Sequence, residues 1–197
     1  MRLPESWSDL TIKQYIDVYN ILETSFDDID KFAHIISNLS GIELNNVYAI
    51  PLTDFDAMVK RVSFIWKEMP GEGLPREIEV CGQKYSGCFE MNKKTAGQYI
   101  DFCHFLKTNN RENIHNILSI IYIPKGEKYD GDLQKARAEL FYEHLTMNIA
   151  YPVYVFFCNV LTHLIKIIPD YLDKEMQTVI RMAMKEARHS PNIGAGT

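Results

Sequence analysis

The heptapeptide TIKQYID at residues 11–17 returns as TAGQYID at residues 95–101, with five of the seven positions identical. In both copies a Thr stands three residues before a Gln, which is the pattern of a helix-capping box. The Thr side chain accepts a hydrogen bond from the backbone of the Gln, and the Gln side chain reaches back to the N–H of the Thr. We therefore expect a helix to begin at each copy.

The similarity continues beyond the heptapeptide. Each copy is followed by apolar residues at helical spacing, then by a polar turn, and then by a second apolar stretch, FAHIISNLSGI at 32–42 and IHNILSIIYIP at 114–124. A duplicated helix pair accounts for the shared Thr, Gln, Tyr and Ile without a ligand, and a chance match is the other alternative because capping chemistry of this kind is common. We favour the duplicated packing unit.

The segments between the two pairs predict further helices and one hairpin. A short helix is expected over residues 43–49, and a longer one begins after Thr53 or Asp54 and ends before Pro70. Alternating residues from 77 to 90 predict a hairpin with Gly82-Gln83 as its turn, which pairs Val80 with Tyr85. A lone hairpin is barely stable, so it should lie on the helices or join the sheet of a partner.

The C-terminal third predicts three helices. The first covers residues 133–148 with Asp132 as its N-cap, the second has Pro152 in its first turn and stops before Pro169, and the third covers 170–188. The expected fold is mainly α: a multi-helix bundle built from two helix-pair lobes with one small antiparallel β-hairpin. Its expected parts are an N-terminal helical lobe at 1–75, a hairpin insertion at 76–91, a C-terminal helical lobe at 92–190 and a flexible tail at 191–197.

Composition narrows the possible functions. The chain has 197 residues, a net charge of −5 and a pI near 5.7, and this balance argues against broad nucleic-acid binding. The N-terminus shows no apolar signal segment, and the four cysteines form no C-x-x-C pair, so reduced thiols in a cytoplasm are expected. The most apolar stretch, 149–168, carries polar residues at helical spacing, so we expect a buried helix and no membrane span.

No motif predicts catalysis or a cofactor. Phosphate-binding, dinucleotide-binding, nucleophile-elbow and zinc-protease patterns are all missing from the sequence. Cys81, Cys88, Cys103 and His104 are the candidate ligands for a zinc site, but their spacing lacks the paired ligands of such sites. We predict no catalytic residues, no cofactor and no metal.

The helix expected at 170–188 is the best candidate for binding a partner. It has an apolar seam next to a basic stripe, and two interpretations are open. The seam either packs on the protein's own core, or it enters a groove of a partner whose rim is acidic. The candidate residues are Met176, Ile180, Arg181, Ala183, Met184, Lys185 and Arg188.

Three stretches resemble small helical proteins encoded in the morphogenesis gene blocks of tailed bacteriophages, including crAss-like and related gut phages: LPESWSDLTIKQYIDV at 3–18, KYSGCFEMNKKTAGQYIDF at 84–102 and AYPVYVFF at 150–157. The resemblance implies a non-enzymatic virion component of the head–tail or tail region, or a packaged protein. It also implies phage virion or tail proteins as partners, self-association within an assembly, and a place in the virion or in the host cytoplasm during assembly. A tail assembly chaperone absent from the mature particle is the alternative, and an unrecognised helical enzyme or metal protein is the second.

Overall fold

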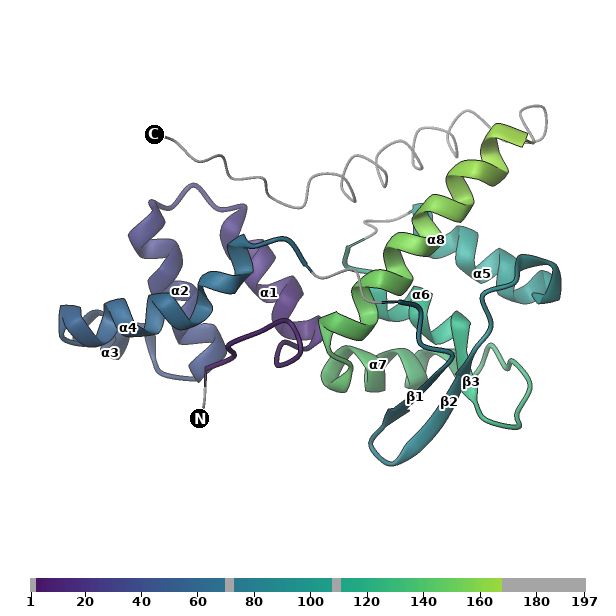
Figure 1. Cartoon of the computed structure of the whole chain (residues 1–197), viewed down its shortest axis with the longest axis horizontal. Coiled ribbons are helices and arrows are strands. Elements are labelled where there is room, and N and C mark those ends of the chain that lie inside the picture. The colour runs from purple at the N-terminus through teal and green to yellow at the C-terminus, as the bar shows by residue number, and fades with distance from the viewer. Residues whose placement is uncertain (1–2, 70–72, 108–110, 168–197) are drawn as a thin grey trace.

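The computed structural model describes residues 3–69, 73–107 and 111–167, and within them the chain forms eight α-helices, two short 3-10 helices and three strands. Figure 1 shows the first four helices at one end of the long axis and the remaining helices with the sheet at the other. The predicted mainly α fold with a small β-element is confirmed. The N-terminal lobe consists of α1 (Ile12–Leu22), α2 (Asp28–Ser40), α3 (Leu44–Tyr48), α4 (Leu52–Val62) and the 3-10 helix η1 (Ser63–Trp66).

Both copies of the heptapeptide start a helix with a capping box. At α1, the backbone N–H of Gln14 donates to Thr11 Oγ1 at 3.3 Å, and the N–H of Thr11 donates to Gln14 Oε1 at 3.0 Å. At α5 (Ala96–Lys107), the same two bonds join Thr95 and Gln98 at 3.2 and 3.0 Å. Each helix is followed by a second one, α2 in the first case and α6 (Ile114–Ile121) in the second. The prediction of two equivalent helix starts is confirmed.

The hairpin exists, but its turn lies one residue earlier than predicted, which shifts the partner of each strand residue by two positions. Strands β1 (Glu77–Val80) and β2 (Gln83–Gly87) place Ile78 opposite Tyr85, and Val80 opposite Gln83. The turn residues are Cys81 and Gly82, with φ of 50° and 79°. Positive φ at both central positions is typical of a type I′ turn, which matches the twist of the strands and favours Gly at the second position.

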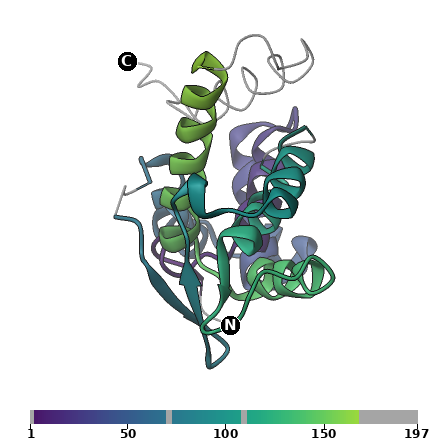
Figure 2. The same ribbon diagram turned by 90° about the vertical axis from the view of Figure 1, so that its right-hand side faces the viewer.

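A third strand, β3 (Tyr122–Pro124), pairs antiparallel with β2 and was not predicted. It follows α6 without a connecting loop, so the hairpin joins a sheet that its own chain completes. The phenol of Tyr122 donates to the carbonyl of Pro75 at 2.8 Å, and its ring lies 6.5 Å from that of Phe141. The sheet is thereby fixed to the helices of the C-terminal lobe, as Figure 2 shows from the side.

The predicted helix over 133–148 divides into two helices. Helix α7 (Gln134–His144) follows Leu133 rather than a capping Asp132, and the backbone is extended at Leu145 before α8 (Met147–Ile167) begins. The extension is needed because this segment pairs with the N-terminal segment of the chain. Pro152 lies inside α8, not in its first turn as expected.

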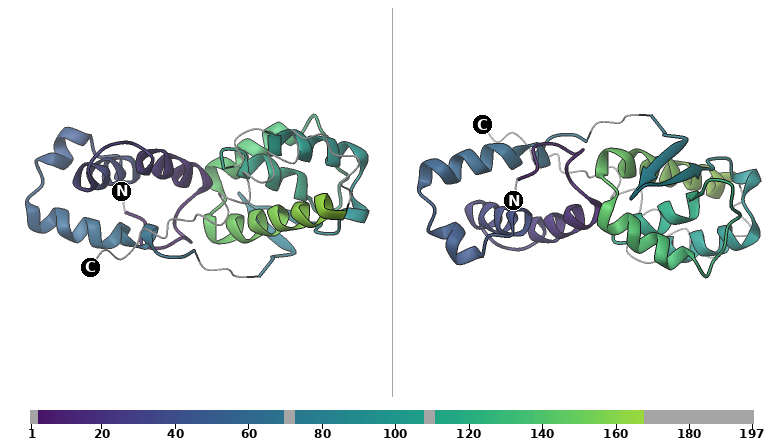
Figure 3. Two further views of the ribbon diagram at one scale, coloured as in Figure 1. Left: turned by 90° about the horizontal axis from the view of Figure 1, so that it is seen from above. Right: turned by 90° about the horizontal axis from the view of Figure 1, so that it is seen from below.

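The two lobes meet where the start of α1 lies beside the α7–α8 junction. Thr11 and Thr146 form an antiparallel bridge, with bonds from Ile12 N to Leu145 O at 3.0 Å and from Met147 N to Leu10 O at 2.8 Å. Lys13 also pairs with Glu143 at 2.7 Å. Figure 3 shows the lobes end to end around this connection, which orients α1 relative to α8.

Candidate functional site

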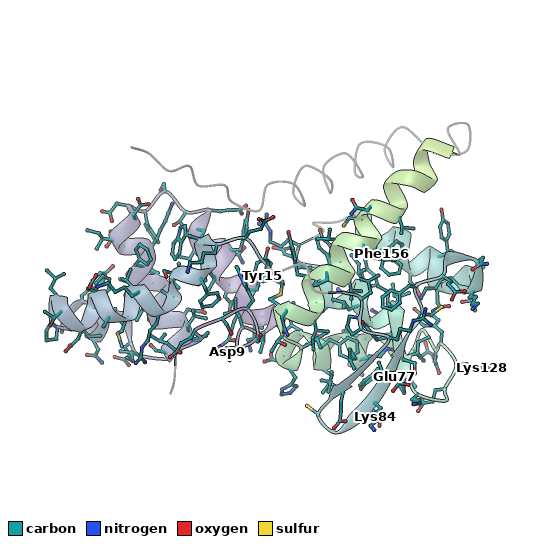
Figure 4. The ribbon with its side chains drawn as sticks, in the orientation of Figure 1. Asp9, Tyr15, Glu77, Lys84, Lys128 and Phe156 are labelled. Carbon is teal, nitrogen blue, oxygen red and sulfur yellow. The ribbon has the colours of Figure 1, made fainter. Side chains whose placement is uncertain are left out.

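Aromatic side chains line one face of α1. Tyr15 and Tyr19 are four residues apart, a spacing that puts both rings on the same side of a helix, with centroids 6.0 Å apart. Trp7 contacts Tyr15 edge-on at 6.3 Å and Phe64 at 5.2 Å. Tyr15 lies on α1 close to the junction of the lobes (Figure 4), where burial raises the pKa of its phenol. This row connects the junction to the far end of α1.

Arg111, from the segment before α6, places its positively charged guanidinium against the last ring of this aromatic row, Tyr19. Its guanidinium carbon lies 3.0 Å from the centroid of the Tyr19 ring, and Nη1 is 3.1 Å from Glu23 Oε1. The Arg111 side chain is only 13% exposed, whereas that of Glu23 is 61% exposed. Stacking on an aromatic face and pairing with a carboxylate are the two contacts a guanidinium makes best. The contact also ties the second helix pair to the first.

A pocket of about 220 Å³ opens next to this arrangement, between the end of α1, the start of α2 and η1. The rings of Phe32 and Trp66 form part of its wall, with centroids 4.5 Å apart. It combines apolar walls with charged groups. The described residues that line it are Tyr19, Leu22, Glu23, Asp28, Lys31, Phe32 and Trp66.

The surroundings of the pocket are acidic. Helix α2 begins with Asp27 as its N-cap and has Asp28 and Asp30 in its first turn, where carboxylates complement the positive end of the helix dipole. Residues 1–69 carry eleven acidic and six basic side chains, so this part of the chain accounts for the whole formal charge of −5. The N-terminal lobe is therefore acidic, and residues 70–197 are balanced.

The same lobe exposes large apolar side chains. Ile29 is 70% exposed and Leu52 is 81% exposed, with Phe26 and Tyr48 at 43% and 52%. These four belong to a set of seven such residues in the described part of the chain, so exposed apolar groups concentrate between residues 26 and 52. Scattered exposed apolar residues are ordinary, but four of them within residues 26–52 make this part of the N-terminal lobe a candidate contact surface.

The C-terminal lobe contains a buried polar cluster with a structural role. Arg137 Nε donates to the carbonyl of Ser119 at 2.7 Å, and Gln134 Nε2 donates to Ser119 Oγ at 2.6 Å. These bonds attach α7 to the last turn of α6, whose final carbonyls have no partner within the helix. Nη2 of Arg137 is buried as well and has no hydrogen-bond partner among the described residues.

The buried amine of Lys94 is a candidate for a catalytic or binding group. Burial lowers the pKa of its amine, and Nζ lies 3.4 Å from the carbonyl of Ile120 and 6.0 Å from the Phe157 ring centroid. The adjoining cavity, lined in part by Gln98 and Phe102, is only about 10 Å³. That space fits one water at most, so it cannot admit a substrate.

The predicted site residues fall in two groups. Those of the helix expected at 170–188 lie outside the described residues. Of the cysteines, Cys81 is exposed in the hairpin turn, Cys88 is half-buried and Cys158 is buried. The described residues contain no group of three or more His, Cys, Asp or Glu side chains placed to hold a metal ion.

The pocket was not predicted from sequence. The residues that line it come from three separate segments, so no local pattern in the sequence predicts it. Among the described helices, none combines the length and apolar composition that crossing a bilayer requires.

Comparison with protein-family models finds no match, and the same holds for comparisons with curated proteins and with solved structures.

Proposed function

We propose that this protein is non-enzymatic and acts through protein–protein contacts as a component of a tailed-phage particle. The observation that carries the contact role is the N-terminal lobe, where an open aromatic pocket, four exposed apolar side chains and an excess of acidic groups occur together. Interfaces typically surround apolar and aromatic anchors with a polar rim, and this lobe supplies both. The phage context comes from the resemblance of residues 3–18, 84–102 and 150–157.

Two surfaces support this role. The acidic lobe suits a basic, amphipathic partner, because complementary charge accelerates association and selects among partners. The segment at 170–188, with its apolar seam and basic stripe, has the opposite character and suits an acidic groove. A chain with one surface of each kind can join neighbours on two sides. The proposed partners are phage virion or tail proteins.

Mass spectrometry of purified particles tests the proposal. A virion component is found in particles in a fixed ratio to the major structural proteins, whereas a tail assembly chaperone is present in infected cells and absent from particles. A chain lacking residues 170–197 should be produced but not incorporated. Absence of the full-length protein both from particles and from complexes with tail proteins would refute the contact role.

A further inference from the structure

We infer that the aromatic pocket of the N-terminal lobe binds the guanidinium of an arginine side chain that a partner protein presents. The inference rests on the proposed contact function and names the chemical group that this surface recognises. It starts from a juxtaposition that exists only in the folded lobe, where three aromatic rings and two carboxylates line one open cavity of about 220 Å³.

The aromatic rings of the pocket come from three elements. Tyr19 belongs to α1, Phe32 to α2 and Trp66 to η1, and all three side chains are half-buried. The ring centroids of Phe32 and Trp66 are 4.5 Å apart, so these two rings form one wall. The face of an aromatic ring is electron-rich and attracts a cation, and Trp does so most strongly. A cation therefore gains more from these walls than it would from aliphatic ones.

A carboxylate at the pocket is available to such a cation. Asp28 lines the pocket, and Asp27 and Asp30 lie on the same turn of α2. Asp27 accepts a hydrogen bond from the backbone N–H of Asp30, and Asp30 accepts one from the phenol of Tyr48. The exposed side chain of Asp28, by contrast, makes no hydrogen bond or ion pair with another described residue. Asp28 can therefore pair with a group from outside the chain.

The charge around the pocket also favours a cation. Besides the three carboxylates of α2, Glu23 lines the pocket, while Lys31 lines it and Arg111 contacts two of its lining residues. Four acidic groups against two basic ones leave a net formal charge of −2. Residues 1–69 as a whole carry −5, so the field of the lobe attracts cations and repels anions.

The lobe already holds one guanidinium by these contacts. The guanidinium carbon of Arg111 lies 3.0 Å from the centroid of the Tyr19 ring, and its Nη1 is 3.1 Å from Glu23 Oε1. Tyr19 and Glu23 both line the pocket. The other two rings and Asp28 offer the same combination of an aromatic face and a carboxylate. We therefore expect a second guanidinium to bind there.

The size of the pocket favours a single side chain as its occupant. At about 220 Å³ it is smaller than the roughly 300–1,000 Å³ of sites for drug-sized ligands, so it encloses one head group while the rest of the partner stays outside. A planar guanidinium can stack on a ring and pair with a carboxylate at the same time, whereas a lysine ammonium is compact and more strongly hydrated. Arginine is also enriched among the residues that dominate the affinity of protein interfaces.

Isothermal titration calorimetry of the full-length protein tests which group is recognised. The probes are two capped glycine peptides that differ only at the central residue, which is arginine in one and citrulline in the other. Citrulline has nearly the same shape as arginine but no charge. The arginine peptide should bind at one site per chain and about tenfold or more tightly than the citrulline peptide. Equal affinities, or no saturable binding of the arginine peptide, would overturn the inference.

Substitutions locate the bound peptide. Asp28→Asn removes a charge and Phe32→Leu removes an aromatic face, and each should weaken binding of the arginine peptide by about three- to fivefold. Lys31→Gln should strengthen binding, because it removes a like charge from the pocket. Asp54→Asn is the matched control, because Asp54 is also in the first turn of a helix but does not line the pocket.

An affinity that is the same for all four variants would place the peptide elsewhere and overturn the inference. Asp28→Asn changes an exposed side chain, so it keeps the inference testable if Phe32→Leu fails to fold.

Incorporation into particles identifies the source of the guanidinium. If a partner protein supplies it, Asp28→Asn should be incorporated less than the wild type, and Asp54→Asn should be incorporated equally. Normal incorporation of Asp28→Asn despite weakened peptide binding would assign the pocket to a free organic cation and overturn the partner arginine. The variant Arg181→Gln/Arg188→Gln would do the same if it bound the peptide more tightly than the wild type, since the chain's own arginines would then occupy the pocket.

The pocket inference and the proposed function fail in different ways. A protein that is found in particles but does not prefer arginine over citrulline refutes the inference and leaves the contact role intact. A protein absent both from particles and from complexes with tail proteins refutes the contact role, whereas the preference for arginine is measured on the isolated protein.

Discussion

The α1–α2 and α5–α6 pairs begin with the same capping box, but the Gln of each box lies in a different environment. Gln14 is half-buried, whereas Gln98 is 4% exposed and its Nε2 also donates to the carbonyl of Ile120 at 3.1 Å. That carbonyl belongs to the last turn of α6, where helical carbonyls need partners from outside the helix. The repeated heptapeptide therefore sets the start of both helices, and its surroundings decide whether it also supports the second helix.

The pairs differ again at their far ends. Helix α2 has 13 residues and ends at Gly41 with φ of 72°, a left-handed cap that suits glycine. Helix α6 has eight residues and leads directly into β3. The first pair is thus covered by short helices and leaves a pocket, while the second is enclosed by a sheet, α7 and α8.

The largest expected effect is the difference in unfolding free energy lost when a core ring is removed next to each helix pair. Phe141→Ala removes a fully buried ring that lies 5.0 Å from Tyr85 and should lower the free energy of unfolding by about 3–5 kcal/mol. Phe32→Ala removes a half-buried ring beside the pocket and should cost about 1–2 kcal/mol. Urea denaturation of both variants measures the difference. Equal losses would show that the first pair is packed as tightly as the second.

The next effect concerns two glycines of the C-terminal lobe. A Cβ at Gly87 would lie 2.7 Å from the Tyr122 ring, so Gly87→Ala should destabilise by about 1–3 kcal/mol through overpacking. Gly97, within the second heptapeptide, has no such neighbour closer than 3.9 Å, so Gly97→Ala should stabilise α5 by up to about 1 kcal/mol. Thermal unfolding followed by circular dichroism distinguishes them. A shift of the same sign in both variants contradicts this account.

Replacing the two capping glutamines tests the comparison directly. Gln14→Ala should cost about 0.5–1 kcal/mol, the scale of a lost capping interaction. Gln98→Ala should cost roughly 1 kcal/mol more, since it also removes a buried hydrogen bond to Ile120. Denaturant unfolding of both variants measures this: the two midpoints should differ, while the dependence of the unfolding free energy on denaturant concentration stays the same. If the two variants prove equally stable, the second role of Gln98 is wrong.

The smallest effect depends on pH. Burial lowers the pKa of His115 on α6, and its Nδ1 has no hydrogen-bond partner among the described residues. The unfolded chain therefore takes up a proton near pH 6.5 while the folded chain stays neutral until a lower pH, so stability falls as the pH drops below about 6.5. His115→Gln should flatten the unfolding free energy between pH 6.5 and 5. A variant as sensitive to pH as the wild type would exclude His115 as the cause.

Local signals explain what could be predicted from sequence. The capping boxes, the apolar spacing and the glycine of the hairpin turn are all encoded within a few residues, and the starts of α1 and α5 and the presence of the hairpin followed from them. What failed depends on distant partners: β3 forms because β2 is there to pair with it, and the α7–α8 break exists because Thr146 meets Thr11. The pocket is of the same kind, because Tyr19, Phe32 and Trp66 converge only in the folded lobe.

The bridge between Thr11 and Thr146 has a consequence for synthesis on the ribosome. Lys13 and Glu143, beside it, are 130 positions apart in the chain. At a translation rate of roughly 5–20 residues per second, the partner of the N-terminal segment emerges on the order of ten seconds after it. During that interval Trp7 and Leu10, both buried in the finished protein, have no final neighbours from α7 and α8. The newly made N-terminal lobe therefore keeps these apolar residues uncovered until the α7–α8 segment has been translated.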